Sequence, residues 1–163
     1  MKVKDLIAKY GEYEVIEEKL EEILIKPKPK TIYELKNGEI YYTIRFNGSI
    51  SKIVFRNNST DNHLMMMENM FLTEEEALFE IERRYIETEM IRLGGIRDMS
   101  FSDYKKQYHG IAYSRMNNVL YIYSILWENY QGAIYFETKE KAKNAIDIIG
   151  EENIKKYIFN VKD

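Results

Sequence analysis

Apolar residues recur at helical spacing near the start of the chain. Four of them lie at positions i, i+3, i+4 and i+7, on one face of a helix: Val3, Leu6, Ile7 and Tyr10. After Gly11 a second run of the same kind follows, with glutamates on its polar side. We expect residues 1–26 to form an N-terminal helical segment that covers one face of the domain.

The pattern changes to short strand-like runs after Lys26–Lys30, whose prolines disfavour a helix. Three runs are expected to be strands: Thr31–Leu35, Glu39–Phe46 and Ile50–Phe55. Asn37-Gly38 and Asn47-Gly48 separate them. Asn-Gly at such a place predicts a type I′ hairpin turn, in which both central residues have positive φ. The expected result is an antiparallel meander, followed by a polar loop over residues 56–68.

Two later stretches, Phe71–Ile81 and Phe136–Ile146, share the pattern F-x-T-x-E-x-A-x-x-x-I. Each is typical of a strand end, a threonine N-cap, and a helix whose apolar face carries the alanine and the isoleucine. The first copy also has the T-x-x-E capping box. The repeat favours two related halves that superpose, with both isoleucines in the core. Two independent uses of a common strand–threonine–helix arrangement are the alternative.

The remaining elements complete this organisation. In the first half, strand Met70–Leu72 leads into a helix from Glu74 to Leu93, which Gly94-Gly95 ends. In the second half we expect three strands, two helices and a closing strand: Ile111–Ser114, Val119–Leu126, Ala133–Phe136, Lys139–Ile149, Glu151–Tyr157 and Ile158–Val161.

The expected fold class is therefore α+β. A single domain over residues 1–163 would hold two antiparallel β-meander-plus-helix halves, at residues 31–95 and 101–163, after the N-terminal helical segment.

Composition limits the classes of function. A net charge of -3 and a pI near 5.6 argue against broad binding to a phosphate backbone, which needs a basic surface. The chain has no cysteine, which excludes disulfides, thiolate metal sites and cysteine nucleophiles. It shows no secretory signal and no long apolar run, so we expect a cytoplasmic protein with no membrane contact.

The chain offers few groups for catalysis. His63 and His109 are its only histidines, and neither belongs to a metal-ligand pattern. Asp61, His63 and Glu68 are an acid/base candidate in the expected loop, with no pattern that fixes their geometry. The sequence has no phosphate-binding glycine loop and no nucleophile elbow. We therefore expect no enzyme activity, no cofactor and no metal.

The region from Tyr104 to Tyr135 is rich in tyrosine. Exposed tryptophan and tyrosine are favoured anchors of protein interfaces. The candidate protein interface consists of four residues: Trp127, Tyr130, Tyr104 and Tyr108. Two other interpretations are base stacking on a sheet, which the acidic balance disfavours, and half-buried sheet positions, which suit the β-propensity of tyrosine.

Short blocks spread over most of the chain are similar to one group of proteins. They are K-P-K-P-K-T-I-Y-E-L-K-N-G from Lys26, Tyr41-Tyr42, E-N-M-F-L-T-E-E-E-A from Glu68, Ile81–Arg84, and I-G-E-E-N-I-K-K-Y from Ile149. In these blocks the chain resembles small accessory proteins of phages, prophages and plasmids of low-GC Gram-positive bacteria. It departs from their pattern at Tyr33, Glu68 and Asn153, where Trp, Gly and Arg are usual.

The resemblance implies a mobile-element source and says little about activity. Small acidic proteins of such origin without enzyme motifs are often inhibitors of host defence, including anti-CRISPR proteins, an inference by analogy. We therefore expect a non-enzymatic protein that binds and modulates a host protein, for example a CRISPR effector or another defence nuclease. Two alternatives stay open: a small nucleic-acid-binding module of phage replication or packaging, and a small-ligand-binding protein with a pocket between its halves.

Overall fold

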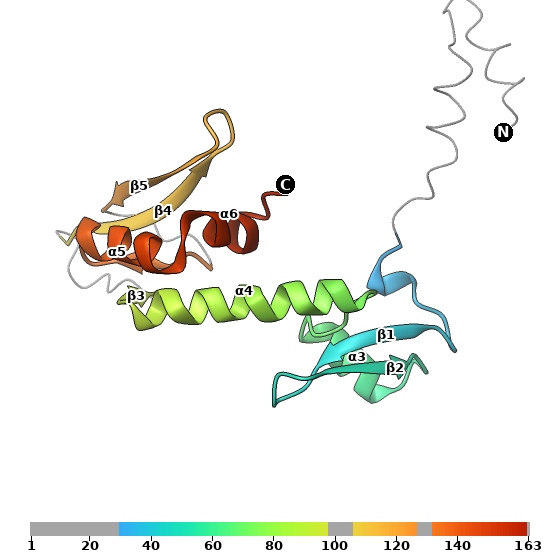
Figure 1. The fold of residues 1–163 in the computed structure, drawn as a ribbon. Helices are drawn as coiled ribbons and strands as arrows, with labels where there is room; N and C mark the ends of the chain where they lie inside the picture. The colour runs from blue at the N-terminus through green and yellow to red at the C-terminus, as the bar shows by residue number, and fades with distance from the viewer. Residues whose placement is uncertain (1–29, 98–105, 127–131, 163) are drawn as a thin grey trace, which may run out of the picture.

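The computed structural model describes residues 30–97, 106–126 and 132–162 (Figure 1). The expected helical segment over residues 1–26 lies outside this part of the chain. In chain order the described elements are η1 (Ile32–Glu34), β1 (Ile40–Ile44), β2 (Ile50–Val54), α3 (Ser59–Met66), α4 (Glu74–Arg92), β3 (Gly95–Ile96), β4 (Tyr108–Ser114), β5 (Val119–Ile125), β6 (Tyr135–Phe136), α5 (Lys139–Ile149) and α6 (Glu151–Phe159). The fold is α+β, as predicted, with two separate antiparallel sheets. We call residues 30–73 the first unit and the described residues from Gly95 onward the second unit.

The first unit is built on the hairpin of β1 and β2. The Gly48 N–H donates to the Arg45 carbonyl (2.9 Å), and the Arg45 N–H donates to the Ser49 carbonyl (2.8 Å). Gly48 has a φ of +80°, whereas Asn47 is not among the residues with positive φ. The hairpin is confirmed, but its connection is a three-residue loop that ends on one left-handed glycine, so the predicted type I′ turn is wrong.

Two segments of the first unit differ from the predictions. The expected strand Thr31–Leu35 contains the short helix η1, where the Glu34 carboxylate accepts a hydrogen bond from the Thr31 N–H (2.9 Å). The expected loop over residues 56–68 contains helix α3, whose N-cap Asn58 accepts from the Asp61 N–H (3.0 Å). In both cases a local bond between a side chain and the backbone three residues away stabilises a helical turn.

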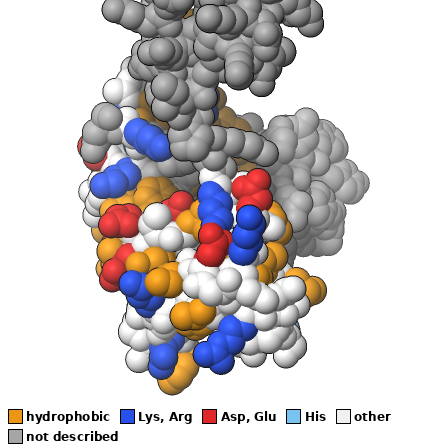
Figure 2. Space-filling model, turned by 90° about the vertical axis from the view of Figure 1, so that its right-hand side faces the viewer, with side chains coloured by type: hydrophobic (Ala, Val, Ile, Leu, Met, Phe, Trp, Pro, Cys, Tyr) orange, Lys and Arg blue, Asp and Glu red, His pale blue; other side chains and the backbone are white. Residues whose placement is uncertain are grey.

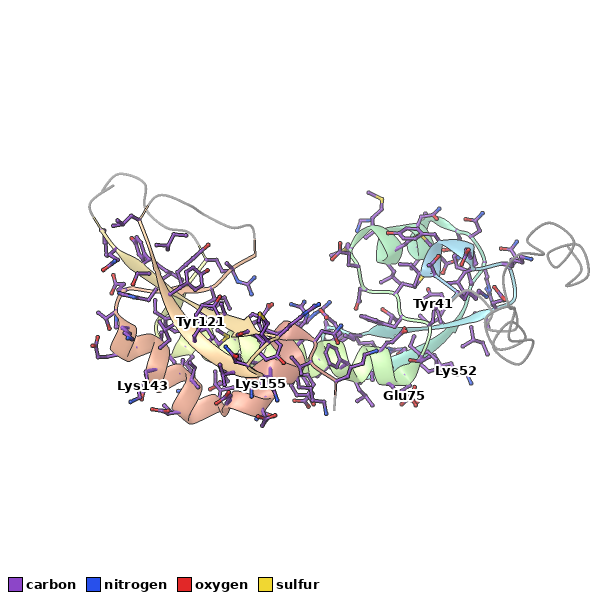
Figure 3. All side chains as sticks on the ribbon, turned by 90° about the horizontal axis from the view of Figure 1, so that it is seen from above. Tyr41, Lys52, Glu75, Tyr121, Lys143 and Lys155 are labelled. Carbon is purple, nitrogen blue, oxygen red and sulfur yellow. The ribbon has the colours of Figure 1, made fainter. Side chains whose placement is uncertain are left out.

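Helix α4 begins where the capping box predicts. The Thr73 hydroxyl accepts from the Glu76 N–H (3.1 Å), and the Glu76 carboxylate accepts from the Leu72 N–H (2.9 Å). Gly94, with a φ of +98°, follows the end of the helix. The helix contacts β1 and β2 near its start and packs against α5, α6 and β3 along the rest of its length (Figure 1). The two units therefore lie at opposite ends of α4, as the positions of Tyr41 and Tyr121 in Figure 3 show.

The second unit is a sheet with strand order β3-β6-β4-β5, in which each neighbouring pair is antiparallel. β6 has only two residues but pairs on both sides. Phe136 is fully buried in the main core, where α4, α5 and α6 cover one face of the sheet. Tyr135, also fully buried, packs on the other face against Tyr108 and Ile125.

Of two predictions for the second unit, one is confirmed and one is wrong. The hairpin of β4 and β5 is confirmed, with Ser114 opposite Val119. The expected closing strand Ile158–Val161 is wrong, because α6 continues through Phe159. Ile158 and Phe159 pack against the main core, so burial of these residues on a helix prevails over their β-propensity.

The two halves share one chain order. After each hairpin the chain returns to lie antiparallel to the first strand, with Phe71 opposite Tyr42 and Phe136 opposite His109. A threonine N-cap and a helix follow each time. The first return is a single bridge rather than the expected strand. Whether the two halves superpose in full stays a prediction. The shared chain order is a condition that such a superposition must meet.

The repeated isoleucines are less buried than expected. Ile81 and Ile146 are both only partly buried, and Ile146 packs at the margin of the main core. α4 instead buries Ala77, Ile86 and Met90. The prediction that both isoleucines are core residues is therefore wrong. Both are only partly buried, and Ile146 lies at the margin of the main core.

Phe136 is fully buried in the main core, so we expect its truncation to destabilise the fold. Phe136→Ala should lower the free energy of unfolding by about 3–5 kcal/mol, because it leaves a cavity in the main core. Phe46→Ala is the matched control, since Phe46 is 104% exposed at the tip of the first hairpin and should cost less than about 0.5 kcal/mol. Urea denaturation followed by circular dichroism measures both, and equal costs would show that β6 does not hold the core.

Candidate functional site

An apolar cleft lies where β4 and the chain before β6 separate. β6 pairs with β4 only at His109 and Gly110. Beyond Gly110 the antiparallel register would place Ile134 opposite Ile111, but no such pair forms among the described residues. The space between the two segments is part of a cleft of about 420 Å³.

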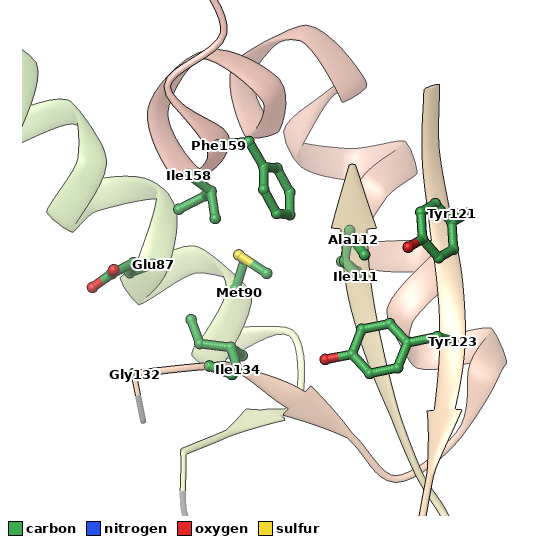
Figure 4. Close-up of a pocket in the computed structure, with 11 residues that line it drawn as sticks. Glu87, Met90, Ile111, Ala112, Tyr121, Tyr123, Gly132, Ile134, Ile158 and Phe159 are labelled. Carbon is green, nitrogen blue, oxygen red and sulfur yellow. The ribbon is translucent and has the colours of Figure 1, made fainter. Parts of the chain in front are cut away.

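Four elements and the segment before β6 line this cleft (Figure 4). The lining residues are Glu87 and Met90 of α4, Ile111 and Ala112 of β4, Tyr121 and Tyr123 of β5, Ile158 and Phe159 of α6, and Gly132, Ala133 and Ile134. Most are apolar, and Met90 projects from α4 toward the middle of the cleft. The volume is within the range of small-ligand and side-chain pockets.

The polar groups of the cleft sit at its rim. The Glu87 carboxylate points away from the centre in Figure 4 and accepts hydrogen bonds from Arg83 and from Arg97 Nη2, the latter at 2.8 Å. Its charge is therefore paired. The Tyr123 hydroxyl is directed toward Ile134, and its ring occupies the space that a Cβ at Gly110 would need. The glycine thus lets the ring lie across β4.

A charged clamp holds β6 beside β4. Glu137, the residue after β6, accepts from Lys106 Nζ at 2.8 Å and from Lys141 Nζ at 2.9 Å. These two ammonium groups, Lys106 first, lower the pKa of the Glu137 carboxyl to about 2. The clamp joins the segment before β4, the end of β6 and the first turn of α5, at the surface and outside the cleft lining.

The structure separates the sequence-predicted interface residues. Tyr108 is 3% exposed, so its ring is part of the core rather than of a surface for a partner. Tyr104, Trp127 and Tyr130 lie outside the described residues, and their interface role stays a prediction.

Sequence reasoning missed Tyr121 and Tyr123 as site residues, although both belong to the tyrosine-rich region. They alternate along β5 opposite the small residues Ala112 and Gly110 of β4. Large rings facing small side chains across a hairpin are the signal that could have identified this face.

A buried pair of ionisable side chains lies in the first unit, away from the cleft. The Tyr41 hydroxyl donates to Asp61 Oδ1 (2.8 Å), and the N–H groups of Arg56 and Asn58 donate to Asp61 Oδ2 (2.9 and 3.2 Å). Tyr41 is 0% and Asp61 2% exposed. Burial raises the pKa of the Tyr41 hydroxyl, and the carboxylate beside it adds to this.

Asp61 has a structural role. Burial favours its neutral form, but the hydrogen bonds from Arg56, Tyr41 and Asn58 outweigh burial and leave the pKa of the carboxyl below its usual value. Of the acid/base candidate Asp61, His63 and Glu68, the structure buries Asp61 among Tyr41, Arg56 and Asn58 and leaves His63 and Glu68 exposed. The network instead anchors the start of α3 to β1.

Comparisons with family models, curated proteins and solved structures found no match to this chain. In the described ranges no three His, Cys, Asp or Glu side chains are grouped in a way that could hold a metal ion. None of the helices described here has both the length and the apolar character required to cross a membrane.

The Tyr41–Asp61 bond should stabilise the first unit. Tyr41→Phe removes a donor from a buried carboxylate and should lower the free energy of unfolding by about 1.5–3 kcal/mol. Tyr33→Phe is the control, because Tyr33 is 75% exposed and its hydroxyl is in contact with water. Thermal or urea unfolding at neutral pH measures the difference, and an equal effect of both changes would contradict the role of the bond.

The same network predicts a dependence on pH. Because the pKa of Asp61 is lower in the folded than in the unfolded chain, its stabilising effect is present above the unfolded value of about 3.9 and is lost as the pH falls through the folded value. Asp61→Asn should therefore destabilise the protein at pH 7, and the gap to the native chain should narrow toward about pH 3. A gap that is constant with pH would show that the carboxylate charge is not stabilised by folding.

Proposed function

We propose that this protein is a non-enzymatic binding protein that modulates a host protein, and that the cleft of the second unit holds this partner. The observation that carries the proposal is the cleft itself, which is open, mostly apolar and bounded by the edge of β4. Apolar concave sites beside exposed backbone are suited to holding another chain.

The chemistry of the cleft supports binding rather than catalysis. Its titratable side chains are Glu87, Tyr121 and Tyr123. Glu87 is held by two arginines, and no histidine, serine or lysine is among the described lining residues. A nucleophile next to a base, which most covalent mechanisms need, has no counterpart in this lining.

The resemblance to mobile-element accessory proteins supports a host protein as the partner. Within that class, a defence nuclease such as a CRISPR effector is the partner we propose, by analogy with other small proteins of such origin. Of the two alternative functions, the volume of the cleft, about 420 Å³, favours a small-ligand-binding protein. The cleft is lined by Glu87 and Met90 of the predicted first half (residues 31–95) and by residues of the second half, which supports a pocket between the halves.

The tagged full chain should capture a specific host protein from a lysate of a low-GC Gram-positive bacterium, and the two purified proteins should form the complex again. Ala112→Arg should weaken that complex by roughly tenfold or more, because it places a long cation in an apolar cleft. Met116→Arg is the control, since Met116 is 96% exposed in the turn between β4 and β5 and lies outside the cleft lining. If the partner is a nuclease, its cleavage rate should fall in the complex.

If the folded native chain binds no host protein, the proposal is wrong. Binding that both arginine variants weaken equally would place the partner surface elsewhere.

The protein alone should not bind DNA or RNA at physiological salt. Its net charge is -3, and on the face drawn in Figure 2 Lys and Arg are intermingled with Asp and Glu rather than gathered in one basic patch. A mobility-shift assay with random oligonucleotides at about 150 mM salt tests this. Tight binding that falls steeply with added salt would instead support the nucleic-acid-binding alternative.

A further inference from the structure

The first unit shows how a strand edge of this fold can be closed. Ile44 lies two residues beyond Tyr42, which pairs with Phe71. The Ile44 N–H donates to Asn69 Oδ1 (3.3 Å), and Asn69 Nδ2 donates to the Ile44 carbonyl (2.8 Å). Asn69 also binds the Thr43 hydroxyl (3.0 Å). One amide side chain thus makes the two hydrogen bonds that a neighbouring strand would make.

At the equivalent position of the second unit, no described side chain provides this closure. Ile111 lies two residues beyond His109, which pairs with Phe136, as Ile44 does beyond Tyr42. The residue two before Phe136 is Ile134, where the first unit has Asn69 two before Phe71. Isoleucine has no hydrogen-bonding side chain, and the cleft lies at this place, between Ile134 and the edge of β4.

The open edge of β4 also lacks the usual protection against pairing. Residues 111–114 read Ile-Ala-Tyr-Ser, and all four are partly exposed. They include no proline and no lysine, the residues that commonly blunt exposed strand edges. On the other side β4 is paired with β5 along its whole length, so the strand is fixed and extended in advance of any ligand.

We propose that the second unit binds an extended peptide segment of its partner, which adds as a strand to the edge of β4 at residues 111–114 and places one large apolar side chain in the cleft. The backbone of the peptide makes the hydrogen bonds that Asn69 makes in the first unit. Met90, Ile134 and Phe159 contact the inserted side chain. This inference rests on the proposed function in that the segment belongs to the host partner.

The lining determines which segment fits. No lysine or arginine is among the described residues around the cleft, and Glu87 is neutralised by Arg83 and Arg97. An anionic or cationic anchor would therefore lose its hydration without gaining a partner. Strand addition uses the backbone of the peptide for affinity and a pocket for specificity. The fitting segment is therefore one of high β-propensity with a leucine, methionine or phenylalanine for the cleft.

The experiment selects displayed random peptides of roughly ten residues, longer than a typical strand, on the full native chain. The enriched peptides should share one central large apolar residue. The best one is then synthesised with N-methyl groups on alternate residues, in both registers. One register should lose binding and the other keep it, because only every second N–H of an added strand faces β4.

Two further measurements use the protein. The Ala112→Arg variant should bind the peptide roughly tenfold or more weakly, while Met116→Arg, in the turn after β4 and outside the strand edge, binds like the native chain. In case Ala112→Arg does not fold, hydrogen exchange on the native chain gives a second readout. Those amides of residues 111–114 that face away from β5 should gain protection with the peptide, because they become hydrogen-bonded.

Failure to enrich any peptide would overturn the inference, and so would peptides that tolerate both N-methyl registers. If the native chain self-associates and Ala112→Arg abolishes this, the occupant of the cleft is a second copy of the chain instead. A host partner whose capture is insensitive to Ala112→Arg would remove this inference and keep the proposed function. Peptide binding as described, with no host protein captured, would remove the proposed function and keep strand addition.

Discussion

The second unit depends on the burial of a strand of two residues. Tyr135 and Phe136 are both fully buried, on opposite faces of the sheet, so β6 joins the helical core to the cluster on the other face. The next two residues extend this constraint. Glu137 binds Lys106 and Lys141, and the Thr138 hydroxyl accepts from the Lys141 N–H (3.2 Å) and so caps α5. Four consecutive residues therefore link the sheet, its core and the start of a helix.

The elements that could be predicted are those encoded by neighbouring residues. The caps at Thr73 and Thr138 are formed as predicted, because each depends on a hydrogen bond to the backbone three residues on. Helix α3 was missed for a different reason. Its N-cap is local, but Asp61 at its third position is stabilised by Tyr41, which lies twenty residues earlier in the sequence. A run of polar residues that contains a buried carboxylate cannot be told from a loop until its partner is known.

The candidate site could be predicted only in part. The alternation of Tyr121 and Tyr123 on β5 opposite Ala112 and Gly110 follows from the register of the β4–β5 hairpin, whose two strands were predicted. The cleft also requires residues 132–134 to leave the sheet, where Ile134 packs in the main core with Ile86 and Met90 of α4. No local pattern reports such a divergence. The tyrosine-rich region was therefore predicted as the region of the candidate site. Tyr108 was predicted to be an interface residue, but the fold buries it.

The comparison of the two halves suggests how one fold can hold two roles. In the first unit Asn69 closes the edge of β1, and the Tyr41–Asp61 bond anchors the adjacent helix. In the second unit Ile134 stands in the place of Asn69 and the edge of β4 borders an apolar cleft. A closed edge adds stability and offers no backbone to a partner, whereas an open edge offers backbone but invites unwanted pairing. Because α4 packs against both units, the closed unit can stabilise the helix that forms one wall of the open unit's cleft.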